Sequence, residues 1–451
     1  MTDAVIAERR LKLFSVLCVL IVLSPIPLIL PHFQPGWTEQ LISQSLGTVS
    51  LMCMSLSMLL SSRARPLEWL SGGLDKAYVL HKWLGLTALA TVYLHDSFEA
   101  EIKRIPDQFG RTDLASDIGG LALDGLTVLI IATLVMLIPY RIWFWTHRLM
   151  TAVFILSAVH FIGIAKPFAL QSFAGLYIMA WTVAGTLAGT YALRPSSWRR
   201  SRHYSVEEVS RTGRYARITL VPEGRRIGKP RPGQFAFLRR ADGSGRGHPF
   251  TISHHDAQTG RLGFAMRQSG EWTTCLIAEL ETGTKLHIEG PFGSFRPARG
   301  GPRQIWIAGG IGVTPLLAWA ASGRPVDTRV DIIVVDRASD AIPSLDGLRA
   351  FADQEPNVSL KVIETSRVAR PTARDLLRLM SERSGRADIY FCGPKGLLNS
   401  VKEAIADAKP GTFRLLRERF EFRTGLPHPA DWRDRLGLSS TLFDNAYERL
   451  R

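Results

Sequence analysis

The apolar residues of this chain are concentrated in its first 195 residues, where six windows are long enough to cross a membrane as helices. A helix needs about 20 residues to span roughly 30 Å of hydrocarbon. The windows are residues 11–30, 41–60, 77–94, 118–139, 146–165 and 169–193. Charge is concentrated in the rest of the 451 residues, which excludes both a wholly soluble and a wholly membrane-embedded protein. We therefore expect a multidomain membrane protein that begins with a six-helix transmembrane bundle.

Basic residues in the short loops between the windows indicate the orientation of this bundle, because Lys and Arg are enriched in cytoplasmic loops. One side receives Arg9, Arg10, Lys12, Arg63, Arg65, Arg141, Arg148, Arg194, Arg199, Arg200 and Arg202. The other side receives Lys103, Arg104, Arg111 and Lys166, together with more acidic residues. We expect both termini and the whole second half to face the cytoplasm, with the bundle in the inner (plasma) membrane.

The formal net charge of +15 fits this membrane interpretation better than a nucleic-acid partner, because the basic residues follow the loops. The four cysteines form no CxxC pair and no set of close spacings. A disulfide scaffold, a zinc site and an iron–sulfur cluster are therefore not expected.

Four histidines lie within the apolar windows or directly at their end, His81 and His95 on the third span and His147 and His160 on the fifth. Ionisable residues are costly inside a membrane and usually have a function there. A single histidine would most simply be a hydrogen-bonded residue between packed helices. Two pairs, 14 and 13 residues apart on helices of the same direction, favour metal ligation.

The spacing of the histidines predicts two levels across the membrane. At about 1.5 Å per residue, His81 and His147 lie near the cytoplasmic face, and His95 and His160 near the outer face. Each level offers two imidazoles, as a bis-histidine haem b requires, and two such haems would relay electrons through the bilayer. A spacing of 14 returns close to the same helix face, whereas 13 does not. The fifth helix is therefore either locally irregular or approached by its two haems from different directions.

The second half changes to short strands separated by Gly and Pro, such as residues 215–221 and 232–238, which predict a small antiparallel barrel. Residues 248–253 (His-Pro-Phe-Thr-Ile-Ser) follow. Phe250 could lie on an isoalloxazine ring, and Thr251 could place a hydroxyl near its redox nitrogen. A plain strand is the alternative for this segment taken alone.

Arg267 and residues 270–273 (Gly-Glu-Trp-Thr) add a cation and a glycine turn before a helix expected near Thr273. Backbone N–H groups at a helix start bind anions, which suits a flavin pyrophosphate. Residues 290–294 (Gly-Pro-Phe-Gly-Ser) form another expected tight turn.

Residues 304–308 are an expected strand that enters Gly-Gly-Ile-Gly-Val-Thr-Pro at 309–315 and a helix at 316–320. Strand, glycine turn and helix together predict a dinucleotide site. Two further strands, 330–335 and 387–391, end at Asp336-Arg337 and at Cys392-Gly393-Pro394. Alternation of strands with helices predicts a parallel α/β sheet with ligands at the carboxyl ends of its strands. Cys392 is either close to the reacting nicotinamide or a small apolar strand-end residue.

Taken in order, these motifs resemble a known superfamily. Paired histidines on the third and fifth spans resemble the ferric reductase transmembrane domain, and the second half resembles the ferredoxin-reductase-type flavin and nicotinamide module. Together they resemble bacterial members of the NADPH oxidase and ferric reductase superfamily, over about residues 10–423.

The resemblance implies roles for individual residues. His81, His95, His147 and His160 would be haem ligands. His248, Pro249, Phe250, Thr251, Ile252 and Ser253, with Arg267, Gly270, Trp272 and Thr273, would bind FAD. Gly309, Gly310, Gly312, Thr314, Pro315, Arg337, Cys392, Gly393 and Pro394 would bind the nicotinamide dinucleotide. Thr251 and Cys392 are the candidate catalytic residues. Residues 419–423 resemble the family's ending, where an aromatic side chain can cover the flavin, but this chain continues to Arg451.

The expected function is transfer of electrons from cytoplasmic NAD(P)H through FAD and two haems b to an acceptor outside. Oxygen, giving superoxide, is favoured slightly over a ferric chelate because the outer loops are net acidic. Two alternatives remain, a non-enzymatic redox-sensing scaffold and a membrane-tethered flavoreductase without transmembrane transfer. Asp336 would favour NADH and Arg337 NADPH, and only the resemblance favours NADPH.

The expected domains are a transmembrane haem domain (1–195), an FAD-binding barrel (196–299), an NAD(P)-binding α/β domain (300–423) and a tail (424–451). We assign the tail no function.

Overall fold

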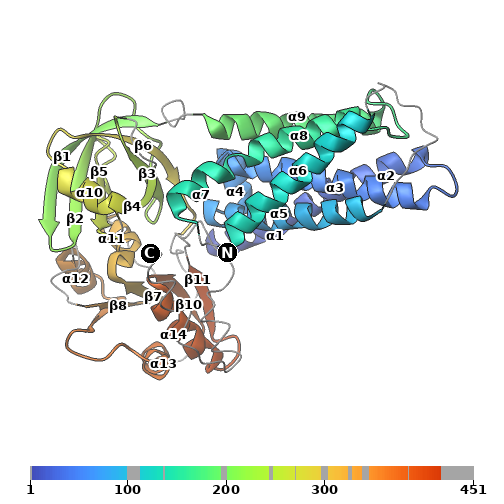
Figure 1. The fold of residues 1–451 in the computed structure, drawn as a ribbon. Helices are drawn as coiled ribbons and strands as arrows, with labels where there is room; N and C mark the ends of the chain where they lie inside the picture. The colour runs from blue at the N-terminus through green and yellow to red at the C-terminus, as the bar shows by residue number, and fades with distance from the viewer. Residues whose placement is uncertain are drawn as a thin grey trace, which may run out of the picture. The chain divides into compact units, whose positions relative to one another are not determined.

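The structure is a computed structural model that describes residues 3–98, 112–135, 138–194, 201–242, 247–269, 271–295, 303–322, 328–337, 345–383 and 385–417. The chain divides into two compact units. One consists mainly of the helices between residues 11 and 194, and the other contains the strand-rich second half. Figure 1 labels the elements of both units.

The helical unit contains α1 (Asp3–Leu23), α2 (Pro25–Ile29), η1 (Leu30–His32), α3 (Thr38–Ser61), α4 (Arg65–Ser71), α5 (Leu74–Ser97), α6 (Thr112–Leu134), α7 (Tyr140–His147), α8 (Met150–Gly163) and α9 (Phe173–Leu193). Five described stretches are long and apolar enough to cross a membrane: Arg9–His32, Thr38–Ser61, Thr112–Leu134, Ile142–Gly163 and Phe173–Leu193. Helix α5 is 24 residues long, but Lys82 and its two histidines reduce its mean hydropathy. The predicted bundle is confirmed, and the helix that carries His81 and His95 is not among the five most clearly apolar stretches.

Contacts within the bundle and its exposed surface both suit a membrane. Helix α3 packs against α9, and α6 packs against α8. A Cβ atom on Gly185 of α9 would lie 2.9 Å from the backbone of Ser55 on α3, so small residues allow this close approach. Apolar side chains meanwhile point away from the bundle, and Leu13, Val128, Leu187 and Phe173 are between 64% and 73% exposed. A soluble protein rarely exposes so many, whereas lipid accommodates them.

Six strands close into an antiparallel barrel in the second unit, confirming the prediction. They are β1 (Arg202–Thr212), β2 (Tyr215–Pro222), β3 (Phe235–Arg240), β4 (His248–His255), β5 (Leu262–Arg267) and β6 (Lys285–Phe292), in the order β1-β2-β5-β4-β3-β6. One expected strand was placed too early. Strand β3 begins at Phe235, because Gly233 has φ +85° and lies in a turn after Pro232. Helix α10 (Glu271–Glu279) follows β5.

Five parallel strands form the sheet that the alternating pattern predicts. They are β7 (Arg303–Gly309), β8 (Val330–Asp336), β9 (Val358–Glu364), β10 (Ala387–Cys392) and β11 (Phe413–Arg417), in the order β11-β10-β7-β8-β9. The helices of this part are η3 (Gly310–Val313), α11 (Thr314–Ala320), α12 (Leu345–Gln354), α13 (Ala373–Ser381) and α14 (Lys395–Ala406). Figure 1 labels the last four of them near the sheet. The strand order reverses between β7 and β10, and ligands of open α/β sheets bind at such a point.

Side chains alternate between two apolar layers on the faces of this sheet. Trp306 and Ala308 of β7 pack with α11 and α12, whereas Ile305 and Ile307 pack with α13 and α14. Both layers are buried, so the strand-end turns are held on a rigid base. Helix α11 also packs against barrel strand β4, which brings the predicted flavin strand next to the predicted nucleotide helix.

Candidate functional site

The four intramembrane histidines come together as two pairs. Helix α5 carries His81 and His95, whereas His147 ends α7 and His160 lies near the end of α8. The ring centres of His81 and His147 are 6.2 Å apart, and those of His95 and His160 are 6.3 Å apart. The pairing of residues from different helices is the one that the sequence spacing predicts.

A break in the fifth span explains how His147 and His160, which are 13 residues apart, can both face the histidines of α5. Residues 148–149 form a turn between α7 and α8, so the helix phase changes between His147 and His160. Arg148 in this turn donates a hydrogen bond from Nη2 to the carbonyl of Leu193 at the end of α9. Of the two alternatives that the sequence left open, local irregularity is what the structure contains.

Each histidine is held through its Nδ1 atom. For three of them the partner is a backbone carbonyl of a neighbouring helix: Ser57 for His81 at 3.0 Å, Ser43 for His95 at 2.7 Å and Ala115 for His160 at 2.7 Å. The Nδ1 atom of His147 lies 3.2 Å from the hydroxyl of Thr133, which also accepts a hydrogen bond from the indole of Trp143. A donated Nδ1–H leaves Nε2 as the lone-pair nitrogen, the arrangement that second-shell carbonyls impose on metal-binding histidines.

The two pairs fit a metal held between imidazoles. A metal–nitrogen bond of about 2 Å on each side, plus about 1 Å from each nitrogen to its ring centre, separates the centres by about 6 Å. No group of three or more His, Cys, Asp or Glu side chains that could hold a metal occurs in the described parts of the chain. A group that brings its own remaining ligands, such as an iron porphyrin, would fit between two imidazoles.

Two glycines leave room for the histidine rings. A Cβ atom on Gly119 of α6 would lie 2.5 Å from Nδ1 of His160, and one on Gly47 of α3 would lie 3.1 Å from the ring of His95. The sequence analysis missed both glycines and the carbonyl partners. A single glycine in an apolar helix is a weak signal, and a carbonyl partner has no sequence signature.

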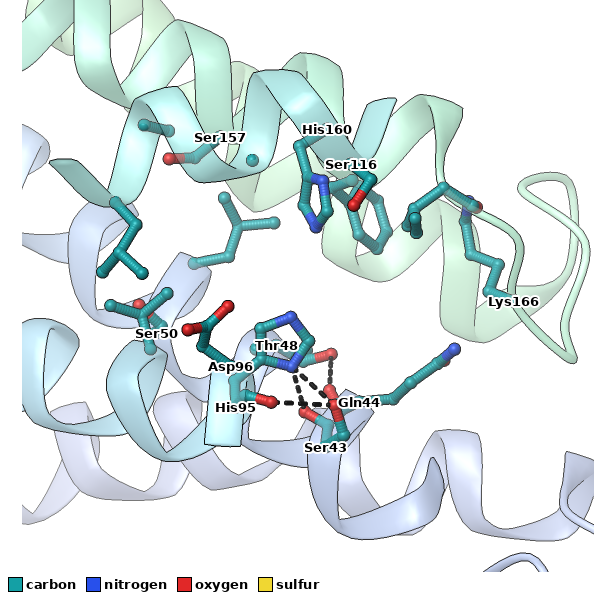
Figure 2. Close-up of a pocket in the computed structure, with 18 of the residues that line it drawn as sticks. Ser43, Gln44, Thr48, Ser50, His95, Asp96, Ser116, Ser157, His160 and Lys166 are labelled. Carbon is teal, nitrogen blue, oxygen red and sulfur yellow. Dashed lines mark hydrogen bonds between the residues drawn. The ribbon is translucent and has the colours of Figure 1, made fainter. Parts of the chain in front are cut away.

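A cavity of about 270 Å³ lies between His95 and His160. Figure 2 shows the two rings entering it from opposite sides, with Asp96 beside His95. Polar groups from α3 and from the loop after α8 also line it, including Gln44 and Lys166. The cavity therefore combines two metal-type ligands with ionisable and amide side chains.

In the second unit, an aromatic stack forms on strand β4. Trp272 of α10 stacks on His248 at 4.0 Å between ring centres and on Phe250 at 6.1 Å. Its indole Nε1 is buried and has no hydrogen-bond partner. A buried donor without a partner is costly, so this atom fits a ligand that offers an acceptor, as a flavin does. Thr251 is also buried and pairs with Phe235 across the barrel.

The glycine turn after β7 is packed directly on the turn after β10. A Cβ atom on Gly312 would lie 2.1 Å from the carbonyl oxygen of Cys392, and one on Gly309 would lie 2.5 Å from the Pro394 ring. A Cβ atom on Gly393 would lie 2.9 Å from the backbone of Gly309. These three glycines therefore serve the contact between the two turns. Thr314 closes the turn through a 3.0 Å hydrogen bond to the carbonyl of Ile311, next to Pro315.

Gly310 faces a polar cluster instead. It has φ +56°, and a Cβ atom on it would lie 3.5 Å from Nη1 of Arg267, 3.7 Å from the hydroxyl of Tyr215 and 3.8 Å from Oδ2 of Asp336. Tyr215 donates a 3.2 Å hydrogen bond to Asp336, joining barrel to sheet. Burial and the charge of Asp336 raise the pKa of Tyr215. Arg267, expected on the flavin, thus also reaches the nucleotide turn, and the sequence analysis missed Tyr215.

Other predicted residues lie near this cluster or outside the described chain. Arg337 is exposed, and its backbone N–H donates to Oδ1 of Asp336 at 2.6 Å. Cys392 is buried and packs in the layer that contains Trp306 and Tyr390. Thr273 accepts a 2.8 Å hydrogen bond from the backbone of Ser269, and Ile252 and Ser253 continue strand β4 after Pro249. Gly270 and residues 419–423 lie outside the described residues.

Comparison with known proteins connects both units to described families. Residues 46–158 match the family described as "Ferric reductase like transmembrane component". The chain is similar to a flavohemoprotein of Halalkalibacterium halodurans, with 26% identity over 47% of this chain and 58% of that protein. It is also similar to the probable electron transfer subunit of dihydroorotate dehydrogenase B from Methanothermobacter thermautotrophicus, with 30% identity over 42% of this chain and 67% of that one. The chain belongs to the NADPH oxidase and ferric reductase superfamily.

Within this superfamily match, the ferric reductase region includes His81, His95 and His147 and ends just before His160. Among solved structures, phthalate dioxygenase reductase aligns with a TM-score of 0.41 and 16% identity, over 50% of this chain and 70% of that one. The chain spans little more than half the length of the Halalkalibacterium flavohemoprotein. As a member of the superfamily with apolar spanning helices, the chain is a membrane protein.

Proposed function

We propose that this protein is a transmembrane oxidoreductase that moves electrons from cytoplasmic NAD(P)H, through FAD and two bis-histidine haems b, to an acceptor on the other side of the membrane. The superfamily supports the oxidoreductase class, and the relatives include a flavohemoprotein and an electron transfer subunit.

The proposal rests on the two histidine pairs, His81 with His147 and His95 with His160. Both have a ring separation that an iron between two imidazoles would fit, and each Nδ1 has an oxygen partner, which would leave Nε2 for the iron. Along α5 the two levels are about 21 Å apart at 1.5 Å per residue. Structural histidines in a core need no such repetition.

When bound, a flavin supplies the chemistry of accepting a hydride and releasing its two electrons one at a time, and haems b supply single-electron transfer across the apolar core. His81 and His147 would hold one haem, and His95 and His160 the other. Each helix carbonyl that accepts from Nδ1 raises the basicity of its imidazole and fixes the ring in place.

The second unit would bind both redox partners of the first step. Phe250, Thr251 and Trp272 would hold the flavin, with Trp272 Nε1 donating to it. Gly310 would let the dinucleotide lie over the turn, at the start of η3 and α11, while Gly309 and Gly312 hold that turn against the turn after β10. Thr251 is the candidate to orient the flavin and Cys392 the candidate to border the nicotinamide, and the domain limits at 195, 299 and 423 remain predictions.

Orientation is inferred from charge. The basic loops favour a cytoplasmic location for the termini and the second unit, in an inner membrane. Oxygen is the proposed acceptor because the outer loops are net acidic and repel anions. A ferric chelate is the second candidate, and Lys166 favours it because this buried cation lines the cavity at His95 and His160.

A reduced-minus-oxidised spectrum of the purified, haem-supplemented protein tests the proposal. We expect two haems per chain and one in a His95→Leu variant. Absence of any Soret band would leave the scaffold alternative standing. NADPH oxidation, superoxide formation and ferric-chelate reduction are then measured on the same protein. Full activity of His95→Leu toward an external impermeant acceptor would favour the tethered flavoreductase.

A further inference from the structure

Lys166 is a buried cation in the wall of the cavity between His95 and His160. It lies in the loop between α8 and α9, and its side chain is only 4% exposed. Figure 2 shows it at one end of the cavity, on the side of the bundle where α8 ends. The sequence analysis used Lys166 only as a loop charge.

The partners that the structure gives Lys166 are neutral groups, and they satisfy its hydrogen bonds in part. Its Nζ donates to the carbonyl of Ile164 at 2.7 Å and to that of Ile162 at 3.3 Å. The ammonium also lies 5.2 Å from the centre of the Phe161 ring. An ammonium has three donors, so one remains. None of the ion pairs found among the described residues includes Lys166, and these partners carry no net negative charge.

A buried ammonium without an anion is unfavourable, since desolvation removes hydration that neutral carbonyls replace incompletely. Asp96 lines the same cavity but forms no ion pair with Lys166. We propose that Lys166 binds a carboxylate within this cavity. The inference rests on the proposed function, because the cavity is the one between the second pair of haem ligands.

Two sources could supply that carboxylate. One is a propionate side chain of the haem held by His95 and His160, and the other is a carboxylate-bearing acceptor such as a ferric citrate chelate. The chemistry at Lys166 is the same in both cases, a charge-assisted N–H···O hydrogen bond in a partly dry site. The consequences differ, because only a propionate is present when no acceptor has been added.

Capping of α8 is the structural alternative for this residue. Lys166 follows α8 and donates to its last carbonyls, as basic residues at helix ends often do. Gln can donate to the same carbonyls without a charge, whereas Arg keeps the charge. Comparison of Lys166→Gln with Lys166→Arg therefore separates capping from anion binding.

The experiment uses the full chain, loaded with haem and flavin, in lipid nanodiscs. Redox titration resolves the two haems, and the haem that is absent from His95→Leu identifies the relevant signal. We expect Lys166→Gln to lower the midpoint potential of that haem alone, because loss of a nearby cation favours the ferric state. We expect Lys166→Arg to keep the wild-type potential. The second arm measures the KM for ferric citrate and the rate of oxygen reduction in wild type, Lys166→Gln and Lys166→Arg.

Each outcome decides between the possibilities. A lower potential without acceptor shows that the Lys166 charge acts on that haem and supports a propionate as the carboxylate. An unchanged potential with a KM for ferric citrate raised about tenfold in Lys166→Gln, and not in Lys166→Arg, assigns it to the acceptor. If neither the potential nor the KM changes in Lys166→Gln, the inference is wrong and Lys166 is a helix cap only. A wild-type protein that binds no haem would instead refute the proposed function, and this inference with it.

Discussion

The helical unit and the strand-rich unit build their candidate sites in opposite ways. In the helical unit, four side chains project from helices, and carbonyls of neighbouring helices fix three of them. In the strand-rich unit, the nucleotide turn is mostly backbone, and the absence of side chains at Gly309, Gly312 and Gly393 brings two turns together. The histidine site should therefore be damaged most by removal of a side chain, and the glycine turns by addition of one.

Removal of one imidazole is expected to have the largest effect. His160→Leu should lower reduction of the external acceptor by more than about 100-fold, because loss of a metal ligand exceeds the cost of losing its second-shell partner. Flavin reduction by NADPH should persist, since its residues lie in the other unit. Stopped-flow absorbance separates the two steps. An equal loss of flavin reduction and of acceptor reduction would show that the two sites are not independent, and would contradict the comparison of the two units.

A methyl group added at Gly312 should come next. The new Cβ would lie 2.1 Å from the backbone oxygen of Cys392, which cannot rotate away. We expect Gly312→Ala to destabilise the second unit by about 3 kcal/mol and to abolish measurable nucleotide binding. Gly396→Ala in α14 is the matched control, because nothing lies within 4 Å of that Cβ. Thermal unfolding and titration with NADP⁺ measure both, and tight binding by Gly312→Ala would contradict the role of the turn.

Gly119→Ala tests whether an added methyl group can also damage the histidine site of the helical unit. Its Cβ would lie 2.5 Å from Nδ1 of His160, so the ring would leave the Ala115 carbonyl. We expect about tenfold weaker haem retention, a typical cost of disturbing a second shell. Leu121→Ala on the same helix is the control, since Leu121 is exposed. Haem content after gel filtration reports the result, and equal content in both variants would refute it.

The smallest effect is expected for Tyr215→Phe, which removes the hydrogen bond to Asp336. One such bond contributes about 1 kcal/mol. Freeing an Asp336 oxygen for a ribose hydroxyl should raise the NADH-to-NADPH ratio of kcat/KM by about fivefold. Tyr204→Phe is the control, because Tyr204 only accepts from the backbone of Ile227 within the barrel. Steady-state kinetics with both nucleotides decide it, and a ratio that moves equally in both variants would exclude a role for Tyr215.

The pH dependence of this pair follows from the pKa of Tyr215, which burial and Asp336 raise above the ordinary 10.0. A raised folded-state pKa means that the contribution of the hydroxyl is complete below pH 10 and is lost as pH rises through the folded pKa. The stability difference between wild type and Tyr215→Phe should therefore be constant across the neutral range and shrink only above pH 10. A difference that already shrinks near pH 8 would contradict this assignment.

The sequence predicted the parts of each site that follow from local spacing. Periodicity and histidine spacing predicted the bundle and both pairs, and they left irregularity of the fifth helix as one of two alternatives. Strand patterns predicted the barrel and the parallel sheet, although Pro232 and Gly233 proved to be a turn. What it missed depends on contacts between distant segments. Ser43 and Ala115 act through carbonyls that every residue has, and Tyr215 meets Asp336 only because the barrel packs against the sheet.

The turn at residues 148–149 also determines where the second histidine-bearing span is anchored. Through Arg148 the turn is held to the carbonyl of Leu193, the last residue of α9. His147 directly precedes Arg148, so the position of its imidazole depends on a helix that carries none of the four histidines. The joint that corrects the helix phase is therefore also the point at which a substitution in α9 would be felt at His147.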